Sequence, residues 1–166
     1  HAVKENIMKV EDWIRINKLT PRLVDVLPNG PKGFPTSVFF SSGGVPEVML
    51  KLRNEGLLNL DVITSTGLTL KENLDWWEQS EKRDFVRKQL RNTRNIDPED
   101  VVHSLENSKK KNMTSTVTFP KGNISPEGSV VKSTAIDKTV IDDDGVYRKI
   151  GPARIFISEA DAIKAV

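Results

Sequence analysis

The stretch from residue 37 to residue 67 constrains the fold more than any other part of this 166-residue chain. It opens on a short apolar run, 37–40, which favours a buried strand. A helix is predicted next, because Pro46 suits a first helical turn and Gly56 suits a helix end. The apolar residues between them recur at helical spacing and are Val45, Val48, Met49 and Leu52. Residues 61–64 favour a second strand, and strand, helix and strand in this order are typical of an α/β layer.

The flanking residues add helices to this layer. Upstream, apolar spacing predicts a helix over 10–18 that ends before Pro21, and residues 23–27 alternate like a short strand. Downstream, we expect two more helices, over 70–79 and 81–91, the second of them highly charged. The first half of the chain is therefore predicted to be mainly helical around a few short strands.

Beyond residue 108 the pattern changes from helices to strands. Alternating residues predict strands over 114–119 and 128–134, and Asp142-Asp143-Asp144-Gly145 has the composition of a hairpin turn. A further strand is predicted over 154–157, followed by a terminal helix. We therefore place a domain boundary after residue 108.

Charge and composition argue against several classes of protein. The chain has 25 basic and 23 acidic residues, for a formal net charge of +2, and they are spread along its length. Because there is no concentrated basic patch, nucleic acid is not an expected partner. No apolar run approaches the ~20 residues needed to cross a bilayer, so no membrane partner is expected. The first ten residues lack the apolar core of a signal peptide, and we expect a cytoplasmic protein.

The chain contains no cysteine. This excludes disulfides, thiol nucleophiles and thiolate-bound metals within these 166 residues. The two histidines, His1 and His103, are far apart in sequence and give no metal pair or triad. For His103, a loop or helix-end position is preferred over a ligand role. The consecutive acids 142–144 lack the spacing of an EF-hand, so a hairpin turn is preferred over a calcium site.

The loop Ser41-Ser42-Gly43-Gly44 is the strongest candidate for binding. It lies between a predicted strand and a helix start, where free backbone N–H groups can hold an anion such as a carboxylate. A tight turn that needs glycine for its backbone freedom explains the same residues equally well. The segment 64–67 stands at a similar junction, so Thr66 is a second candidate for the same pocket. Helix capping, which Thr69 and Glu72 also indicate, is the preferred alternative there.

Two further features have simple structural interpretations. The pair Trp76-Trp77 is compatible with sugar stacking, although a buried Trp77 beside a partly exposed Trp76 is the simpler interpretation. Glu127 lies in a segment rich in turn-forming residues, and nothing in the sequence perturbs its carboxylate. We therefore interpret Glu127 as a solvated loop residue.

Several motifs resemble the dihydroxy-acid and sugar-acid dehydratases. Gly43-Gly44-Val45-Pro46-Glu47-Val48-Met49 resembles the glycine-rich helix start of this family, and Gly122-Asn123-Ile124-Ser125-Pro126-Glu127-Gly128 resembles its most recognisable internal motif. Asn73-Leu74-Asp75-Trp76-Trp77 and Thr134-Ala135-Ile136-Asp137 are most similar to the xylonate dehydratase branch. The resemblance extends from about Val10 to Val166.

The resemblance implies an activity that this chain is not expected to perform alone. Members of the family are hydro-lyases that convert a 2,3-dihydroxy acid to a 2-keto-3-deoxy acid, and they use an iron–sulfur cluster bound through cysteines and a nearby magnesium ion. In the family, the cysteines, most magnesium ligands and the serine base lie outside the matched part. We therefore expect no catalytic residue, no metal ligand and no cofactor bound through this chain. It is interpreted as an internal fragment of a dehydratase for a sugar acid such as xylonate.

The resemblance also gives expectations for fold and contacts. Residues 1–108 are expected to be the C-terminal part of a layered α/β/α dehydratase domain, and residues 109–166 the first strands of a β-barrel-like, swivelling domain. The residues expected to contact a sugar-acid substrate are Ser42, Gly43, Gly44 and Thr66. A homo-oligomer is also expected. Two alternatives remain open: a non-catalytic module that binds an anion or a sugar acid, and a dimerisation module whose exposed strand edges pair with a second copy.

Overall fold

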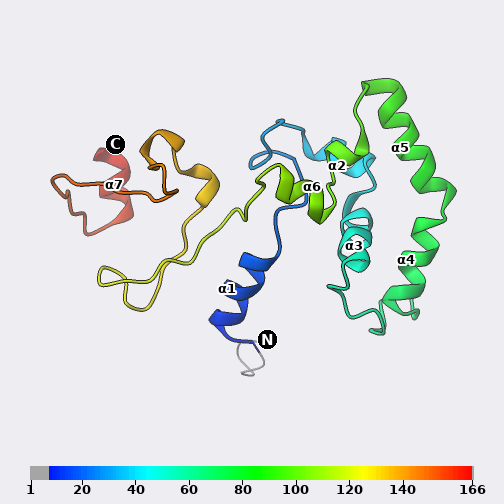
Figure 1. The fold of residues 1–166 in the computed structure, drawn as a ribbon, viewed down its shortest axis with the longest axis horizontal. Coiled ribbons are helices and arrows are strands. Elements are labelled where there is room, and N and C mark those ends of the chain that lie inside the picture. Colours follow the sequence, from blue (N-terminus) through cyan, green and yellow to red (C-terminus); the bar gives the residue numbers. More distant parts are fainter. Residues whose placement is uncertain (1–7, 166) are drawn as a thin grey trace. The chain divides into compact units, whose positions relative to one another are not determined.

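The computed structural model describes residues 8–165 (Figure 1). The chain forms two compact units that divide between Thr134 and Ala135, and each is described by itself. His1 lies outside the described residues. The boundary predicted after residue 108 concerns the domains of a longer protein and stays a prediction.

The first unit is built mainly from helices. They are α1 (Val10–Leu19), α2 (Thr36–Ser41), α3 (Gly44–Asn54), α4 (Leu70–Glu78), α5 (Glu81–Arg94), the 3₁₀ helix η1 (Pro98–Asp100) and α6 (Leu105–Lys110). In Figure 1, α4 and α5 follow one another along one side, and α3 lies beside α4. The helix α2 packs against both α3 and α5, and η1 packs against α5. The helix predicted over 10–18 is confirmed as α1.

Aliphatic side chains from distant parts of the sequence form the core of this unit. Val38 in α2 and Leu90 in α5 pack with Val101 and Val102, which follow η1. All four side chains are almost completely buried. The segment after η1 therefore joins α2 and α5 into one apolar cluster.

The strand predicted over 23–27 is present only as a single bridge. Val24 and Val102 form an isolated antiparallel bridge. On either side of it, the Asp25 N–H donates to the Val101 carbonyl at 2.9 Å, and the His103 N–H donates to the Leu23 carbonyl at 2.8 Å. These bonds satisfy backbone groups that would otherwise be buried without partners.

The prediction of a buried strand over 37–40 is wrong, because these residues lie in α2. The Ser42 N–H and the Ser42 hydroxyl both donate to the Val38 carbonyl, at 2.9 and 2.8 Å. A short apolar run fits a helical turn as well as a strand, and its length does not distinguish the two. Of the run, Val38 is buried whereas Phe40 is exposed, as expected for one turn of helix with a single inner face.

The helices predicted after Pro46 and over 70–79 and 81–91 are confirmed as α3, α4 and α5, although the buried faces of α3 and α5 also contain residues that the apolar patterns did not include. In α3, Val45 is 59% exposed, whereas Glu47 and Leu50 are buried. In α5, Phe85 is 62% exposed, whereas Arg87 and Leu90 are buried. Each inner face thus carries a charged residue that the apolar stripes did not include.

The helix α4 begins with the predicted capping box. The Thr69 hydroxyl accepts a hydrogen bond from the Glu72 N–H at 3.2 Å, and the Glu72 carboxylate accepts one from the Thr69 N–H at 2.7 Å. Hydrogen bonds from the hydroxyl and then the N–H of Thr69 hold the pKa of Glu72 below its usual value. Both contacts satisfy polar groups at the helix start.

Removal of this cap should have a measurable cost. We expect Thr69→Ala to lower the free energy of unfolding by about 1 kcal/mol, because an orphan N–H loses its acceptor. Urea denaturation of the purified protein measures the change. The matched control is Thr93→Ala, since the Thr93 hydroxyl bonds back to the Gln89 carbonyl inside α5 and caps nothing. Equal losses in the two variants would contradict the capping role.

The strands predicted over 114–119 and 128–134 do pair, although only at one point. Thr118 and Val131 form an antiparallel bridge, with N–H to carbonyl distances of 2.8 and 2.9 Å in the two directions. Residues 61–64 contribute a second isolated bridge, between Ile63 and Thr69. The described residues are therefore mostly helical, and their β-pairing consists of isolated bridges. The predicted layered α/β/α architecture and the predicted β-barrel are not confirmed.

The second unit contains the predicted hairpin turn and terminal helix. Ile141 and Tyr147 form an antiparallel bridge across the acidic turn, and an Asp142 carboxylate oxygen accepts from the Val146 N–H at 2.9 Å. The helix α7 (Glu159–Ala165) begins after Ser158, whose hydroxyl caps it. Residues 154–157, predicted as a strand, form no β-bridge with any other described residue. Within residues 8–165, no helix has the length and apolar character required to cross a membrane.

Candidate functional site

The turn between α2 and α3 contains three of the four predicted substrate contacts. Ser42, Gly43 and Gly44 are all buried. The φ angles of Gly43 and Gly44 are 115° and 63°, values that residues with a side chain rarely adopt, so the turn requires glycine at both positions. The Ser42 hydroxyl donates to the Val38 carbonyl and the Gly43 N–H donates to the Phe40 carbonyl. These donors are therefore used within the turn itself.

The carboxylate of Glu47 lies against this turn. A β-carbon placed on Gly43 would lie 3.0 Å from Glu47 Oε2, and the Glu47 residue is only 1% exposed. Arg83 binds the carboxylate with two nitrogens: Nε donates to Oε2 at 2.9 Å and Nη2 donates to Oε1 at 3.0 Å. The hydrogen bond to Glu47 raises the pKa of Arg83, which keeps this guanidinium charged. The start of a helix favours negative charge, and at the start of α3 the Glu47 carboxylate supplies it.

Arg87 connects this carboxylate to the backbone of the turn. Its Nη1 lies 3.2 Å from Glu47 Oε1 and donates to the Ser42 carbonyl at 2.8 Å. Its Nη2 pairs with Glu99, whose other carboxylate oxygen lies 2.7 Å from Lys51 Nζ. Burial opposes the ionisation of Glu99, but Lys51 and Arg87 outweigh it and hold the pKa of Glu99 below its usual value.

These five side chains form what we call the turn network, which consists of Glu47, Lys51, Arg83, Arg87 and Glu99. It holds three positive and two negative charges and links α3, α5 and η1. Its inner members are buried, so each depends on its partners to offset the cost of leaving water. The network fixes the backbone at Ser42 and Gly43 from the side of the core.

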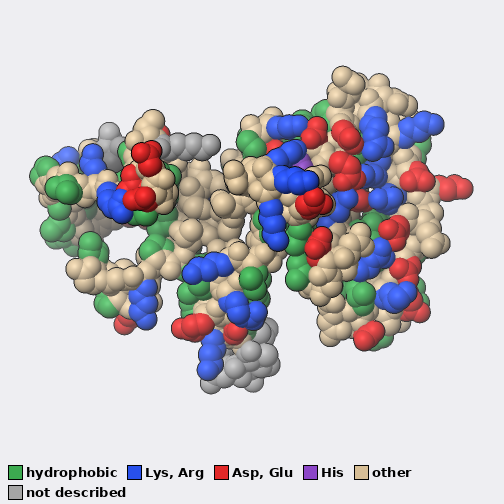
Figure 2. All heavy atoms as spheres, in the orientation of Figure 1, with side chains coloured by type: hydrophobic (Ala, Val, Ile, Leu, Met, Phe, Trp, Pro, Cys, Tyr) green, Lys and Arg blue, Asp and Glu red, His purple; other side chains and the backbone are tan. Residues whose placement is uncertain are grey.

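Other ion pairs in the same helices lie at the surface. Figure 2 shows acidic and basic side chains interspersed over α4 and α5. Arg53 at the end of α3 pairs with Glu78 at 2.6 Å and with Asp75 at 3.0 Å, and both carboxylates are partly exposed. Such exposed pairs contribute little to stability compared with the turn network.

Thr66, the fourth predicted contact, belongs to a separate hydrogen-bond cluster. Its hydroxyl lies 2.9 Å from the Thr64 hydroxyl and 3.2 Å from Oδ1 of Asn73, in the first turns of α4. Thr66 is exposed, in contrast to Ser42. The structure thus gives the two candidate loops different partners, and contact of either with a substrate stays a prediction.

The remaining candidates occupy ordinary structural positions. Trp76 is exposed and Trp77 is half-buried, in agreement with the simpler interpretation of this pair. Glu127 is exposed, as a solvated loop carboxylate would be. Neither position adds a group to the turn network.

His103 is fully buried and lies close to a buried carboxylate. Its Nε2 is 3.9 Å from Asp25 Oδ2, and neither ring nitrogen has a hydrogen-bond partner among the described residues. Burial lowers the pKa of His103 below 6.5; the nearby Lys111 ammonium acts in the same direction, and Asp25 opposes both. The folded protein therefore favours a neutral imidazole.

This histidine should make stability depend on pH near neutrality. In the unfolded chain the imidazole accepts a proton as the pH falls below about 6.5, whereas in the folded chain it accepts one only at lower pH. The free energy of unfolding should therefore decrease as the pH falls. The slope has an upper limit of ~1.4 kcal/mol per pH unit, which it approaches only where the unfolded imidazole is protonated and the folded one is still neutral. Urea denaturation between pH 7.5 and 5.5 measures it, and His103→Gln should flatten the curve in this window. An unchanged slope in that variant would rule out His103 as the cause.

Comparison with known sequences finds similar proteins among the dehydratases. Residues 1–73 match the sequence model of the dihydroxy-acid/6-phosphogluconate dehydratase N-terminal family. The chain is also 55% identical to two D-xylonate dehydratases of Escherichia coli K12: YagF over all 166 residues and YjhG over 163. The chain is thus similar to members of this dehydratase family along almost its whole length.

The same comparison shows how much of a dehydratase these residues represent. The whole chain aligns with YagF and 98% of it aligns with YjhG. In each case the aligned part is 25% of the length of the E. coli enzyme. A dihydroxy-acid dehydratase of Picrophilus torridus is 34% identical over 166 residues, again 25% of its length. The chain thus spans about a quarter of the length of these dehydratases.

The described residues do not fit the metal groups that the family resemblance implies. The sequence has no cysteine to bind an iron–sulfur cluster. Within residues 8–165, no three histidine or acidic side chains are grouped as metal ligands would be. The acidic members of the turn network are instead neutralised by arginine and lysine.

The turn network is the functional candidate that the sequence patterns did not predict. Glu47 was assigned to the glycine-rich motif but not to the buried face of its helix. Arg83 and Arg87 are four residues apart in α5. Two arginines at this spacing point to the same side of a helix, which is a signal for a buried carboxylate partner.

Proposed function

We propose that this chain is a segment of a hydro-lyase that converts a sugar acid such as D-xylonate to its 2-keto-3-deoxy acid. The observation that carries the proposal is the 55% identity to two D-xylonate dehydratases, against 34% to a dihydroxy-acid dehydratase over the same span. The higher sequence identity to the D-xylonate dehydratases, over nearly the whole chain, favours the sugar-acid branch.

The segment would contribute framework to that enzyme. The turn network binds the Ser42 carbonyl through Arg87, and we propose that Ser42, Gly43, Gly44 and Thr66 face the substrate. The iron–sulfur cluster and magnesium ion would be held by residues outside these 166, since the chain offers no thiolates. A cytoplasmic homo-oligomer is part of the same proposal.

Substrate choice tests this function directly. The natural protein that contains this segment should be purified under anaerobic conditions and supplied with D-xylonate, D-gluconate or 2,3-dihydroxyisovalerate. We expect the 2-keto-3-deoxy product from a sugar acid to form at least tenfold faster than the 2-keto acid from the branched substrate. Preference for the branched dihydroxy acid would overturn the assignment to the sugar-acid branch.

The 166-residue chain by itself provides a second test. We expect no turnover of D-xylonate, because this reaction removes an unactivated hydroxyl and these residues cannot hold a cysteine-bound electrophile. Calorimetry of the same sample with D-xylonate tests the alternative of a binding module. Measurable turnover would contradict the proposal, and tight binding without turnover would favour the module.

A further inference from the structure

The dipeptide Asn29-Gly30 is chemically labile wherever the chain is free to move, because asparagine is prone to deamidation. The backbone nitrogen of Gly30 can attack Cγ of Asn29, which closes a cyclic succinimide and releases ammonia. Water then opens the ring to aspartate or isoaspartate, so the net reaction is hydrolysis of the side-chain amide. Glycine favours the attack because it has no side chain to hinder it. Asn29-Gly30 is the only Asn-Gly pair in the sequence.

The attacking nitrogen is occupied in the folded chain. The Gly30 N–H donates to the Val26 carbonyl at 2.7 Å. Before it can attack, this nitrogen must lose its proton and turn toward the side chain of Asn29, and the hydrogen bond opposes both steps. Space is also restricted, since a β-carbon on Gly30 would lie 2.3 Å from the Val26 nitrogen. The Gly30 peptide group therefore cannot turn unless the surrounding loop opens.

This loop, residues 25–34, is closed by further hydrogen bonds, and we call it the Asn-Gly loop. The Lys32 N–H donates to Asp25 Oδ1 at 3.0 Å, and the Leu27 N–H donates to the Phe34 carbonyl at 2.8 Å. Asp25 itself is only 1% exposed. Opening of the loop at Gly30 thus breaks several buried or half-buried contacts together.

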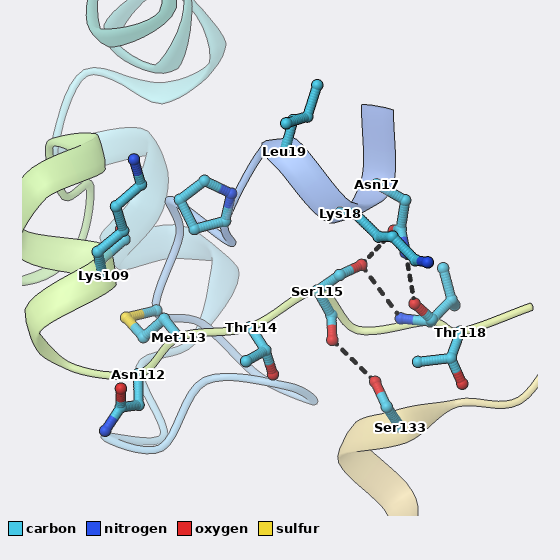
Figure 3. Close-up of a pocket in the computed structure, with 13 residues that line it drawn as sticks. Asn17, Lys18, Leu19, Lys109, Asn112, Met113, Thr114, Ser115, Thr118 and Ser133 are labelled. Atoms are coloured by element: carbon cyan, nitrogen blue, oxygen red, sulfur yellow. Dashed lines mark hydrogen bonds between the residues drawn. The ribbon is translucent and has the colours of Figure 1, made fainter. Parts of the chain in front are cut away.

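The amide that would be attacked is held from a distant part of the first unit. The Thr134 hydroxyl donates to Asn29 Oδ1 at 3.0 Å, across 105 positions of sequence. Thr134 follows Ser133, whose hydroxyl donates to the Ser115 carbonyl at 2.8 Å (Figure 3). The Ser115 hydroxyl in turn donates to Asn17 Oδ1 in α1. The side chain of Asn29 is therefore fixed by a series of hydrogen bonds that begins in α1.

We propose that Asn29 is a deamidation site that the folded Asn-Gly loop keeps closed. The reaction needs an open loop, so its rate in the native protein is the rate in the unfolded chain multiplied by the open fraction. Deamidation of Asn29 thus records how often this loop opens. The isoaspartyl product adds a methylene group to the main chain, for which the closed loop has no space. The proposal does not depend on the dehydratase reaction, and its test does not measure turnover.

Peptide mass spectrometry of the full natural protein tests the site. One sample would be kept native and another unfolded in guanidinium chloride, both in the same mildly alkaline buffer, and the peptide that contains Asn29 followed over time. We expect deamidation to be at least about tenfold slower in the native sample, because even a loop that opens easily is closed most of the time. Equal rates in the two samples, or no deamidation in the unfolded chain, would overturn the proposal.

Variants test the hold on the side chain of Asn29. Thr134 is exposed, so Thr134→Val should leave the fold intact. It should raise the native rate about fivefold, as expected for loss of one hydrogen bond from the closed loop, and leave the unfolded rate unchanged. The matched control is Thr93→Val, which removes a hydroxyl bonded to the Gln89 carbonyl in α5 and should change neither rate. A native rate that Thr134→Val does not raise, or that both variants raise equally, would overturn the role of Thr134.

Discussion

Replacement of Glu47 by glutamine is expected to lower the free energy of unfolding by about 3–5 kcal/mol, the range for loss of one partner from a buried ion pair. The glutamine keeps the shape of the side chain but leaves Arg83 without its bidentate charged partner and Arg87 with Glu99 alone. The Arg87 side chain is only 7% exposed, so water cannot replace the charge that it loses. Urea denaturation at pH 7 measures the change.

Glu78→Gln is the matched control for this experiment. Glu78 also pairs with an arginine, Arg53, but the Glu78 side chain is 44% exposed. Arg53 is only 14% exposed, but it keeps Asp75 as a partner and the Glu78 carboxylate is open to water, so the control should lose no more than about 1 kcal/mol. Similar losses in the two variants would show that burial of the turn network does not determine its contribution.

Replacement of Gly30 by alanine is the second change with a large expected effect. The added β-carbon would lie 2.3 Å from the Val26 nitrogen and 2.4 Å from Asp25 Oδ1. The first of these atoms is backbone, and the second accepts a hydrogen bond from the Lys32 N–H at 3.0 Å, so neither can move without breaking the loop. We expect a loss of about 3 kcal/mol, at the upper end of the usual range for overpacking.

Gly122→Ala distinguishes lack of space from a general effect of alanine. Nothing lies within 4 Å of a β-carbon at Gly122. The substitution should therefore change stability by less than about 1 kcal/mol, with a small gain from the restricted unfolded chain. Thermal unfolding of both variants gives the comparison. A Gly30 variant as stable as the Gly122 variant would show that the loop around Asp25 adapts easily.

Local patterns were sufficient to predict most helices and their ends. Thr69 with Glu72 identified the start of α4, because capping involves residues only three positions apart. The acidic turn of the second unit was also predicted from four consecutive residues. In each case the interaction that forms the structure joins residues that are close in the sequence.

The exceptions are positions where local pattern is ambiguous. The apolar run 37–40 fits both a strand and a helical turn, and only its packing against α5 makes it helical. The predicted strands around Thr118 and Val131 pair at a single bridge, because pairing depends on partners far along the chain. Substrate contact by Ser42, Gly43, Gly44 and Thr66 also stays a prediction, since no contact within this chain tests it.

The sequence by itself determined the resemblance to the dehydratases, the absence of thiolate ligands within these 166 residues and the helices that local caps define. The tertiary structure alone decided which helix faces are buried, and with them the turn network. Glu47 and Arg83 are 36 residues apart, and only the packing of α5 near α3 brings them within hydrogen-bond distance. A charged residue is stable in a core only when such a partner is present, and periodicity along one helix carries no information about a partner on another.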